Sequence, residues 1–181
     1  HPEECTWFST RVLRCQARAE LSVFGYDALD RLTSASISGV YSQGWSYNTI
    51  GNITQRTDNG VPTNYTYGDA AHKHAVTTLN GAQKYWYDAN GNQITRIVGS
   101  DTYVLTWDQE NRLVQVNADE EGEVRDLIAI YSYDGRGYRI AKAVAVYDEG
   151  ALTGYDRTDY YYNEAWQVLE ERFAANAATP E

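Results

Sequence analysis

The chain has 181 residues, of which 43% are hydrophobic and 13% aromatic, and its formal net charge is −10. No apolar run approaches the roughly 20 residues needed to cross a bilayer, so the sequence predicts no membrane span. Its excess of acidic side chains repels phosphate groups, which disfavours nucleic acid and anionic membrane surfaces as partners.

The first 21 residues differ from the rest and are predicted to form a separate N-terminal segment or cap. Val12 to Ala19 could make a short helix or an irregular cap. Cys5 and Cys15 are the only cysteines; a disulfide, two free thiols and a metal site with nearby His1, Glu3 or Glu4 all stay open. The chain does not begin with Met, so we expect a processed product or a piece of a longer protein.

From residue 22 to residue 173 a short phrase recurs, in which an aromatic residue is followed by Asp, Asn or Gly. The steps between copies are 21, 20, 20, 20, 26 and 29 residues. A recurring period of this length is typical of repeat proteins, in which each unit buries its apolar side chains only against its neighbours. The copies are Tyr26-Asp27, Tyr47-Asn48, Tyr67-Gly68, Tyr87-Asp88, Trp107-Asp108, Tyr133-Asp134 and Tyr162-Asn163.

Each phrase is predicted to be the turn of one β-hairpin. Asn and Gly follow the aromatic residue at positions where hairpin loops need positive φ angles, as in Gly91-Asn92 and Glu110-Asn111. A second aromatic or large apolar residue stands two positions before the first, as in Tyr65 and Tyr67, and in a strand both side chains share one face. We therefore expect an all-β fold, a curved antiparallel sheet of stacked β-hairpin repeats.

Two segments outside the regular repeat are expected to be exposed. The acidic stretch from Asp119 to Glu123 falls where one repeat gains about six residues, so a solvated hairpin tip is expected there. Residues 174–181 are small and polar, and we expect a flexible tail. The predicted organisation is thus a segment at 1–21, a repeat domain at 22–173 and a tail at 174–181.

Several copies resemble the tyrosine-aspartate (YD) repeats of the bacterial Rhs family over roughly residues 22–173. The motifs that carry the resemblance are Tyr26-Asp27-Ala28-Leu29-Asp30-Arg31-Leu32, Tyr87-Asp88-Ala89-Asn90-Gly91-Asn92-Gln93-Ile94, Trp107-Asp108-Gln109-Glu110-Asn111-Arg112-Leu113 and Tyr133-Asp134-Gly135-Arg136-Gly137-Tyr138-Arg139-Ile140. The resemblance implies a secreted or cell-surface bacterial protein whose sheet spirals into a hollow shell around a toxin or effector.

A chain of this length is too short to close such a shell, so the resemblance predicts a fragment of shell wall. It ends before the aspartate-bearing self-cleavage region of the family, and no protease residues are carried over. A wall fragment has open sheet edges and an uncovered aromatic face. We therefore expect capping, or self-association through those edges or with the remainder of a larger shell.

Carbohydrate is the ligand that the composition suits best, because aromatic rings stack on sugars and polar groups bond their hydroxyls. The candidate residues are Trp45, Trp86, Trp107, Asp88 and Asp108. The alternative is that the rings pack one repeat on the next and that each Asp caps its own turn.

Catalysis is the competing hypothesis, as a small hydrolase or lyase acting on a glycosidic or ester bond. His72 and His74 would share one face if this segment formed a strand, and Asp69 lies nearby, so a proton-transfer pair or a metal site can be drawn from them. Paired carboxylates such as Asp108 and Glu110 could serve a glycosidase. No hydrolase elbow, phosphate loop or zinc motif is present, so no cofactor, metal or catalytic residue is assigned.

Overall fold

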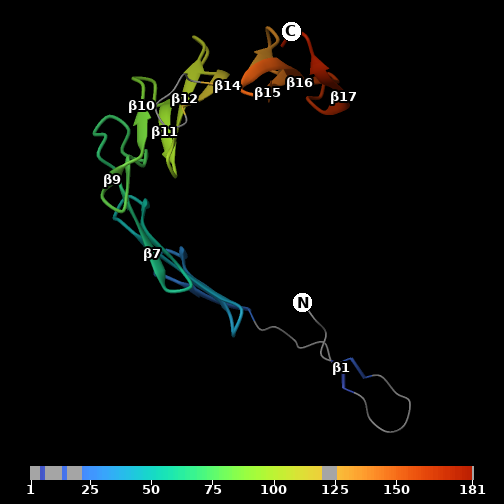
Figure 1. Ribbon diagram of the computed structural model, residues 1–181. Helices are drawn as coiled ribbons and strands as arrows, with labels where there is room; N and C mark the ends of the chain where they lie inside the picture. Colours follow the sequence, from blue (N-terminus) through green and yellow to red (C-terminus); the bar gives the residue numbers. More distant parts are fainter. Residues whose placement is uncertain (1–4, 7–13, 16–21, 120–125, 181) are drawn as a thin grey trace. The chain divides into compact units, whose positions relative to one another are not determined.

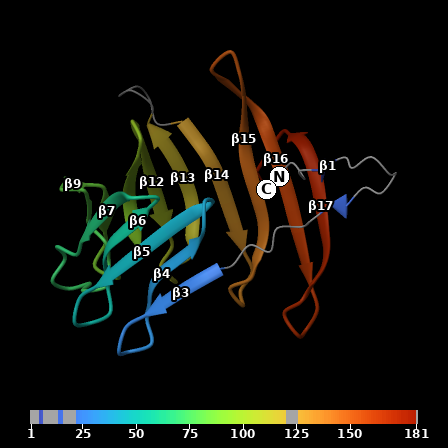
Figure 2. The ribbon, with the colours of Figure 1, turned by 90° about the horizontal axis from the view of Figure 1, so that it is seen from below.

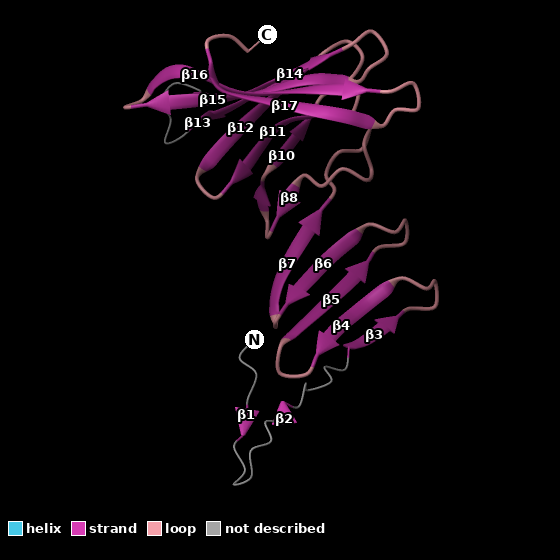
Figure 3. Ribbon diagram, turned by 90° about the vertical axis from the view of Figure 1, so that its right-hand side faces the viewer, coloured by secondary structure: helices cyan, strands magenta, loops and turns pink. Residues whose placement is uncertain are grey.

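The computed structural model describes residues 5–6, 14–15, 22–119 and 126–180, and for 5–6 and 14–15 it describes the backbone alone. Every regular element in these ranges is a β-strand, as Figure 3 shows. The described residues contain no helix that could span a membrane. The predicted all-β fold of stacked antiparallel hairpins is confirmed.

The chain divides into two compact units, His1–Tyr65 and Thr66–Glu181, where the sequence alone suggested one repeat domain. In the first unit each strand pairs antiparallel with the next one along the chain. These strands are β3 (Ser22–Tyr26), β4 (Leu32–Ile37), β5 (Tyr41–Tyr47), β6 (Ile53–Asp58) and β7 (Val61–Thr66), the last residue of which falls in the second unit.

The N-terminal segment contributes a small separate ladder of β1 (Cys5–Thr6) and β2 (Arg14–Cys15). Its register places Cys5 directly opposite Cys15. The disulfide, the two free thiols and the metal site all stay predictions. Most of the predicted helix or cap at Val12 to Ala19 lies outside the described residues, and the two that are described there form β2.

The second unit begins with the short hairpin of β8 (Thr78–Leu79) and β9 (Ala82–Gln83). Eight further strands then form one antiparallel sheet in chain order, and Figures 1 and 2 allow them to be followed one after another. They are β10 (Tyr85–Tyr87), β11 (Gln93–Val98), β12 (Asp101–Trp107), β13 (Leu113–Asp119), β14 (Asp126–Tyr133), β15 (Arg139–Asp148), β16 (Ala151–Tyr162) and β17 (Val168–Ala177).

Within each unit a strand contacts the strands before and after it, and no second layer of described residues covers the sheet. The most buried apolar side chains are accordingly small ones at the centre of the sheets. They are Ala35, Val116, Ala118, Ala129, Ala141 and Ala143. No large described side chain is fully buried. The strands must therefore be held together along the sheet, by bonds between neighbouring hairpins.

The domain limits drawn from the sequence remain predictions. Strand β17 continues to Ala177, and the Asn176 N–H donates a hydrogen bond to Asp156 Oδ1 at 3.2 Å, inside the stretch assigned to a tail. The acidic stretch connects β13 to β14, and all of it except Asp119 lies outside the described residues.

Candidate functional site: the repeated turns and their junctions

Six of the seven aromatic phrases fold into the same five-residue turn. In the first copy Asp27 Oδ1 accepts the N–H groups of Leu29 at 2.9 Å and Arg31 at 3.0 Å, while the Asp27 N–H donates to the Arg31 carbonyl. The same three bonds recur around Asn48, Asp88, Asp108, Asp134 and Asn163. The Asp or Asn side chain therefore closes its own turn, as one of the two sequence alternatives predicted.

The fourth residue of each turn has a positive φ angle. Gly occupies this position three times, at Gly51, Gly91 and Gly137, and Asp30 and Asn111 tolerate it with φ of 57° and 59°. Trp166 has φ of 68°, a conformation that a bulky residue rarely adopts. The recurring Gly and Asn of the phrase are thus explained by backbone geometry.

Three of the turn carboxylates are held in their charged form. Hydrogen bonds from the Arg31 backbone lower the pKa of Asp27, and those from the Arg112 backbone lower the pKa of Asp108. The side-chain hydrogen bond from Asn92 is the main cause of the lowered pKa of Asp88. Carboxylates of this kind are poor general acids near neutral pH, because they stay ionised.

In five of the seven phrases the aromatic side chain donates a hydrogen bond to the repeat before it. Tyr133 Oη donates to the Leu113 carbonyl at 2.9 Å, and Trp107 Nε1 donates to the Gln93 carbonyl at the same distance. The other three junctions of this kind join Tyr47 to Leu32, Tyr87 to Val76 and Tyr162 to Arg139. In four of the five, the acceptor stands six residues after the preceding aromatic residue. The rings therefore connect repeat to repeat.

Two arginines reinforce these junctions from the last position of the turn. Arg112 Nε donates to Asp108 Oδ2 at 2.7 Å within its own turn, and its Nη1 donates to the Asp134 carbonyl of the next turn at 3.2 Å. Its guanidinium also lies 5.1 Å from the centre of the Tyr133 ring. Arg31 makes the equivalent three contacts, with Asp27, the Asn48 carbonyl and the Tyr47 ring.

Other residues at the same turn position also reach the following turn. Asn92 Nδ2 donates to Asn111 Oδ1 at 2.8 Å. The Tyr138 ring contacts the Tyr162 ring in a tilted arrangement at 5.0 Å and the Trp166 ring edge to face at 4.0 Å, measured between ring centres. The position that follows the Asp by four residues is therefore a second connection between repeats, which sequence reasoning missed. The sequence feature that could have revealed this connection is the large or polar side chain that occupies the position in each turn.

The copy that starts at Tyr67 differs because Gly68 has no side chain to close a turn. Thr77 acts instead: its Oγ1 accepts the Gly68 N–H at 2.9 Å and donates to the Thr66 carbonyl at 3.2 Å. The intervening loop is organised by Asp69, whose Oδ2 lies 2.8 Å from His72 Nδ1. The His72 ring packs against Gly91, where an added Cβ would lie 3.1 Å from it.

This Asp69–His72 pair predicts a pH dependence of stability. Its hydrogen bond raises the pKa of His72 above 6.5 and lowers the pKa of Asp69 below 3.8. The His72 contribution is complete below pH 6.5 and is lost as the pH rises through the higher folded-state pKa. The Asp69 contribution is complete above 3.8 and is lost as the pH falls through the lower folded-state pKa.

Urea unfolding at a series of pH values should show that His72→Gln removes the fall in stability above pH 6.5. His74→Gln is the matched control, because it leaves the Asp69–His72 pair in place. An unchanged pH profile in His72→Gln would contradict this account of the loop.

Asn48→Ala should lower the free energy of unfolding by about 1–2 kcal/mol, because the N–H groups of Ile50 and Asn52 lose their acceptor. Asn48→Asp keeps the acceptor and should cost less. Urea unfolding of the two variants checks this. Equal losses for Ala and Asp would show that the side-chain oxygen does not hold the turn.

The five carbohydrate candidates lie in different settings. Asp88 and Asp108 close turns, and Trp107 bonds to the preceding hairpin, so these three have structural partners. Trp45 lies half-buried in β5, opposite Arg56. Trp86, in β10, is 38% exposed. Among the described residues, no hydrogen bond, ion pair or ring contact joins any two of these five. Their role in sugar binding stays a prediction.

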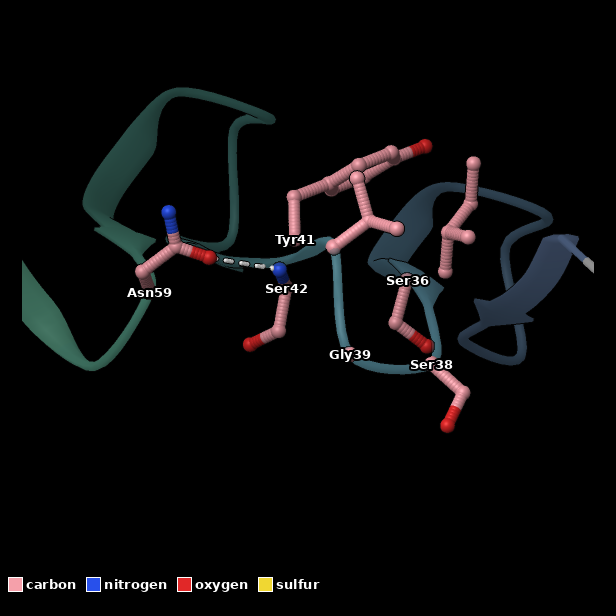
Figure 4. Close-up of a pocket in the computed structure, with 8 residues that line it drawn as sticks. Ser36, Ser38, Gly39, Tyr41, Ser42 and Asn59 are labelled. Carbon is pink, nitrogen blue, oxygen red and sulfur yellow. Dashed lines mark hydrogen bonds between the residues drawn. The ribbon is translucent and has the colours of Figure 1, made fainter. Parts of the chain in front are cut away.

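A shallow hollow of about 390 Å³ lies at the hairpin tips of the first unit, and Figure 4 shows six of its residues labelled. The Ser42 N–H donates to Asn59 Oδ1 there at 2.8 Å. No carboxylate, imidazole or thiol lines the hollow, so it offers no acid-base pair. Its lining consists of Ser36, Ile37, Ser38, Gly39, Val40, Tyr41, Ser42 and Asn59. Nor do the described residues include a group of three or more His, Cys, Asp or Glu that could hold a metal ion.

No protein-family profile matches the chain. The chain is 30% identical over 154 residues to the tRNA nuclease WapA of Bacillus subtilis (strain 168), a match that covers 74% of this chain and 6% of that protein. It is similar to the same extent to the tRNA3(Ser)-specific nuclease WapA of Bacillus spizizenii.

Among solved structures, the chain is similar to the crystal structure of TcdB2-TccC3-TEV, with a TM-score of 0.54 and 11% sequence identity. The match covers 81% of this chain and 9% of that one. The sequence thus spans a small part of each of these three proteins. The fold is that of a segment of the TcdB2-TccC3-TEV chain, which supports the Rhs-like repeat fold expected from the motifs.

Proposed function

We propose that this chain is a segment of the wall of a larger β-shell, and that its role is structural. The observation that carries the proposal is the use of the repeated side chains. The Asp and Asn residues close turns, and the Tyr and Trp residues bond each hairpin to the one before it. Residues committed to such bonds build a sheet, and they are not free to act on a substrate.

The lengths of the similar proteins support the same role. This chain matches 6% of the WapA nuclease and 9% of the TcdB2-TccC3-TEV chain. A segment of that size contributes a few repeats to a much larger assembly. We infer that the complete protein encloses an effector, for which a nuclease is one candidate, and that it is secreted by a bacterium or displayed on its surface.

A turnover assay on the isolated chain tests the structural role. The chain should cleave neither tRNA nor chromogenic glycosides and esters, because the Asp88 and Asp108 carboxylates are committed to closing their own turns. Turnover that disappears in Asp108→Asn or in His72→Gln would overturn the proposal in favour of a hydrolase. Circular dichroism of both variants shows whether the β-sheet is intact.

Carbohydrate binding is a second candidate, favoured by the exposure of Trp86. Trp86 is exposed whereas Trp45 and Trp107 are half-buried, and Asp88 lies two residues from Trp86. On a glycan array, retention that Trp86→Ala abolishes and Trp166→Ala leaves intact would establish it. Retention that survives Trp86→Ala would exclude this site.

A further inference from the structure

The first and last strands of the repeat region, β3 and β17, have edges that are complementary to each other. Strand β3 pairs only with β4, and β17 pairs only with β16, so each has an open edge among the described residues. Both carry large apolar side chains in solvent: Phe24 is 54% exposed in β3, and Leu169 and Phe173 are 67% and 66% exposed in β17. Open edges with apolar side chains are sites at which a further strand adds.

Neighbouring repeats are joined by a hydrogen bond from a Tyr or Trp side chain to a backbone carbonyl, and these two strands carry one partner of that bond each. Tyr26 occupies the donor position of the repeat but is 61% exposed, and its Oη has no acceptor among the described residues. Val168 stands six residues after Tyr162, the position of the acceptor carbonyl in four internal junctions. No phenol or indole donates to the Val168 carbonyl among the described residues. One edge supplies the donor and the other supplies the acceptor.

The backbone register of the internal junctions is constant. In all four, the residue two positions after the acceptor pairs with the residue three positions before the donor. The pairs are Ser34↔Gly44, Thr95↔Val104, Gln115↔Ile130 and Ala141↔Asp159. Applied to Val168 and Tyr26, the rule pairs Glu170 with Val23.

We propose that β17 of one copy of this chain binds β3 of a second copy, antiparallel and head to tail, with Glu170 opposite Val23. Tyr26 Oη of the second copy then donates to the Val168 carbonyl of the first. Because the two surfaces differ, the contact is heterologous and leaves one open edge at each end of the dimer, so it can repeat. The partner is a second copy of this chain, because the donor, the acceptor and the register that the contact needs are all found on the edges of this one sequence.

Sedimentation of the 181-residue chain tests the association. Its mass should rise with protein concentration beyond a dimer, and more so in added salt, because salt screens the repulsion between copies of net charge −10. Leu169→Lys with Phe173→Lys blocks the β17 edge, and Phe24→Lys blocks the β3 edge; each variant alone should stay monomeric. An equimolar mixture of the two should form a 1:1 dimer and nothing larger. Val61→Lys, at an equally exposed site on β7, is the control that should still assemble.

Cross-linking tests the register, in chains whose native cysteines are replaced by Ser. Val23→Cys mixed with Glu170→Cys under a mild oxidant should give a disulfide-linked dimer, whereas Phe24→Cys mixed with Glu170→Cys should not. Tyr26→Phe, which removes only the hydroxyl group, should weaken association about fivefold, as expected for one hydrogen bond. A chain that is monomeric at all concentrations, a mixture that fails to pair, or equal cross-linking at residues 23 and 24 would overturn the proposal. None of these results would contradict the proposed role in a shell wall, because hairpins joined in one longer chain need no association between separate chains.

Discussion

Trp107→Ala should lower the free energy of unfolding by about 3 kcal/mol, near the lower end of the range for removal of a packed tryptophan. The ring is half-buried at the end of β12, and its Nε1 donates to the Gln93 carbonyl at 2.9 Å. Removal costs both the packing of the ring and the bond to the preceding hairpin. Urea unfolding measures the loss.

The repeat itself supplies the control for this prediction. The five other phrases that form the turn have Tyr at the position of Trp107, and Tyr Oη donates to the equivalent carbonyl from Tyr47, Tyr133 and Tyr162. Trp107→Tyr should therefore cost less than Trp107→Phe, which has no donor. A loss below about 1 kcal/mol in Trp107→Ala would instead indicate an exposed ring available to a ligand.

Tyr133→Ala should cost about 3 kcal/mol, for the same reasons at the next junction. Tyr133 Oη donates to the Leu113 carbonyl, and the Arg112 guanidinium covers its ring. Burial is the main cause of the raised pKa of Tyr133, which agrees with a phenol enclosed between hairpins. Urea unfolding of the variant measures the loss.

Tyr26→Ala is the matched control, because Tyr26 opens the same phrase but is 61% exposed. Its removal should cost less than about 0.5 kcal/mol in the monomeric chain, as at an ordinary surface position. If the two substitutions had equal effects, the phrase would stabilise each hairpin by itself and the bonds between hairpins would be unimportant.

The hairpin unit and its turn could be predicted from the sequence because both depend on local chemistry. An Asp or Asn that bonds N–H groups two and four residues later acts within five residues, as at Asp27 and Asp134. The positive φ angles at Gly51 and Gly91 are likewise a property of a single residue. The spacing of aromatic residues then indicated which side chains share a face of the sheet.

The connections between hairpins could not be predicted in the same way. The contacts of Arg112 depend on where the next turn lies, 22 residues later in the chain at Asp134. The replacement of a turn carboxylate by Thr77 in the Tyr67 copy depends on how a longer loop folds back. Both need the register of the sheet, which no local pattern gives.

For the candidate sugar-binding residues, too, part of the outcome could be predicted from the sequence and part could not. Asp88 and Asp108 were candidates because they lie beside aromatic residues, and their place in the turns was the competing interpretation. The two interpretations predict the same sequence pattern, and only the hydrogen bonds separate them. The exposure of Trp86, by contrast, follows from its position on the opposite face from Tyr85 and Tyr87.

The central claim is that the phenol groups of the repeat hold neighbouring hairpins together, and a Tyr→Phe series measures this directly. Substitution of Tyr47, Tyr87, Tyr133 or Tyr162 removes only a hydroxyl group that donates to the preceding hairpin. Urea unfolding should show a loss of about 1 kcal/mol for each of these four. At protein concentrations low enough to keep the chain monomeric, Tyr26→Phe should show a loss below about 0.5 kcal/mol. Equal stability of all five variants and the unsubstituted chain would contradict the claim.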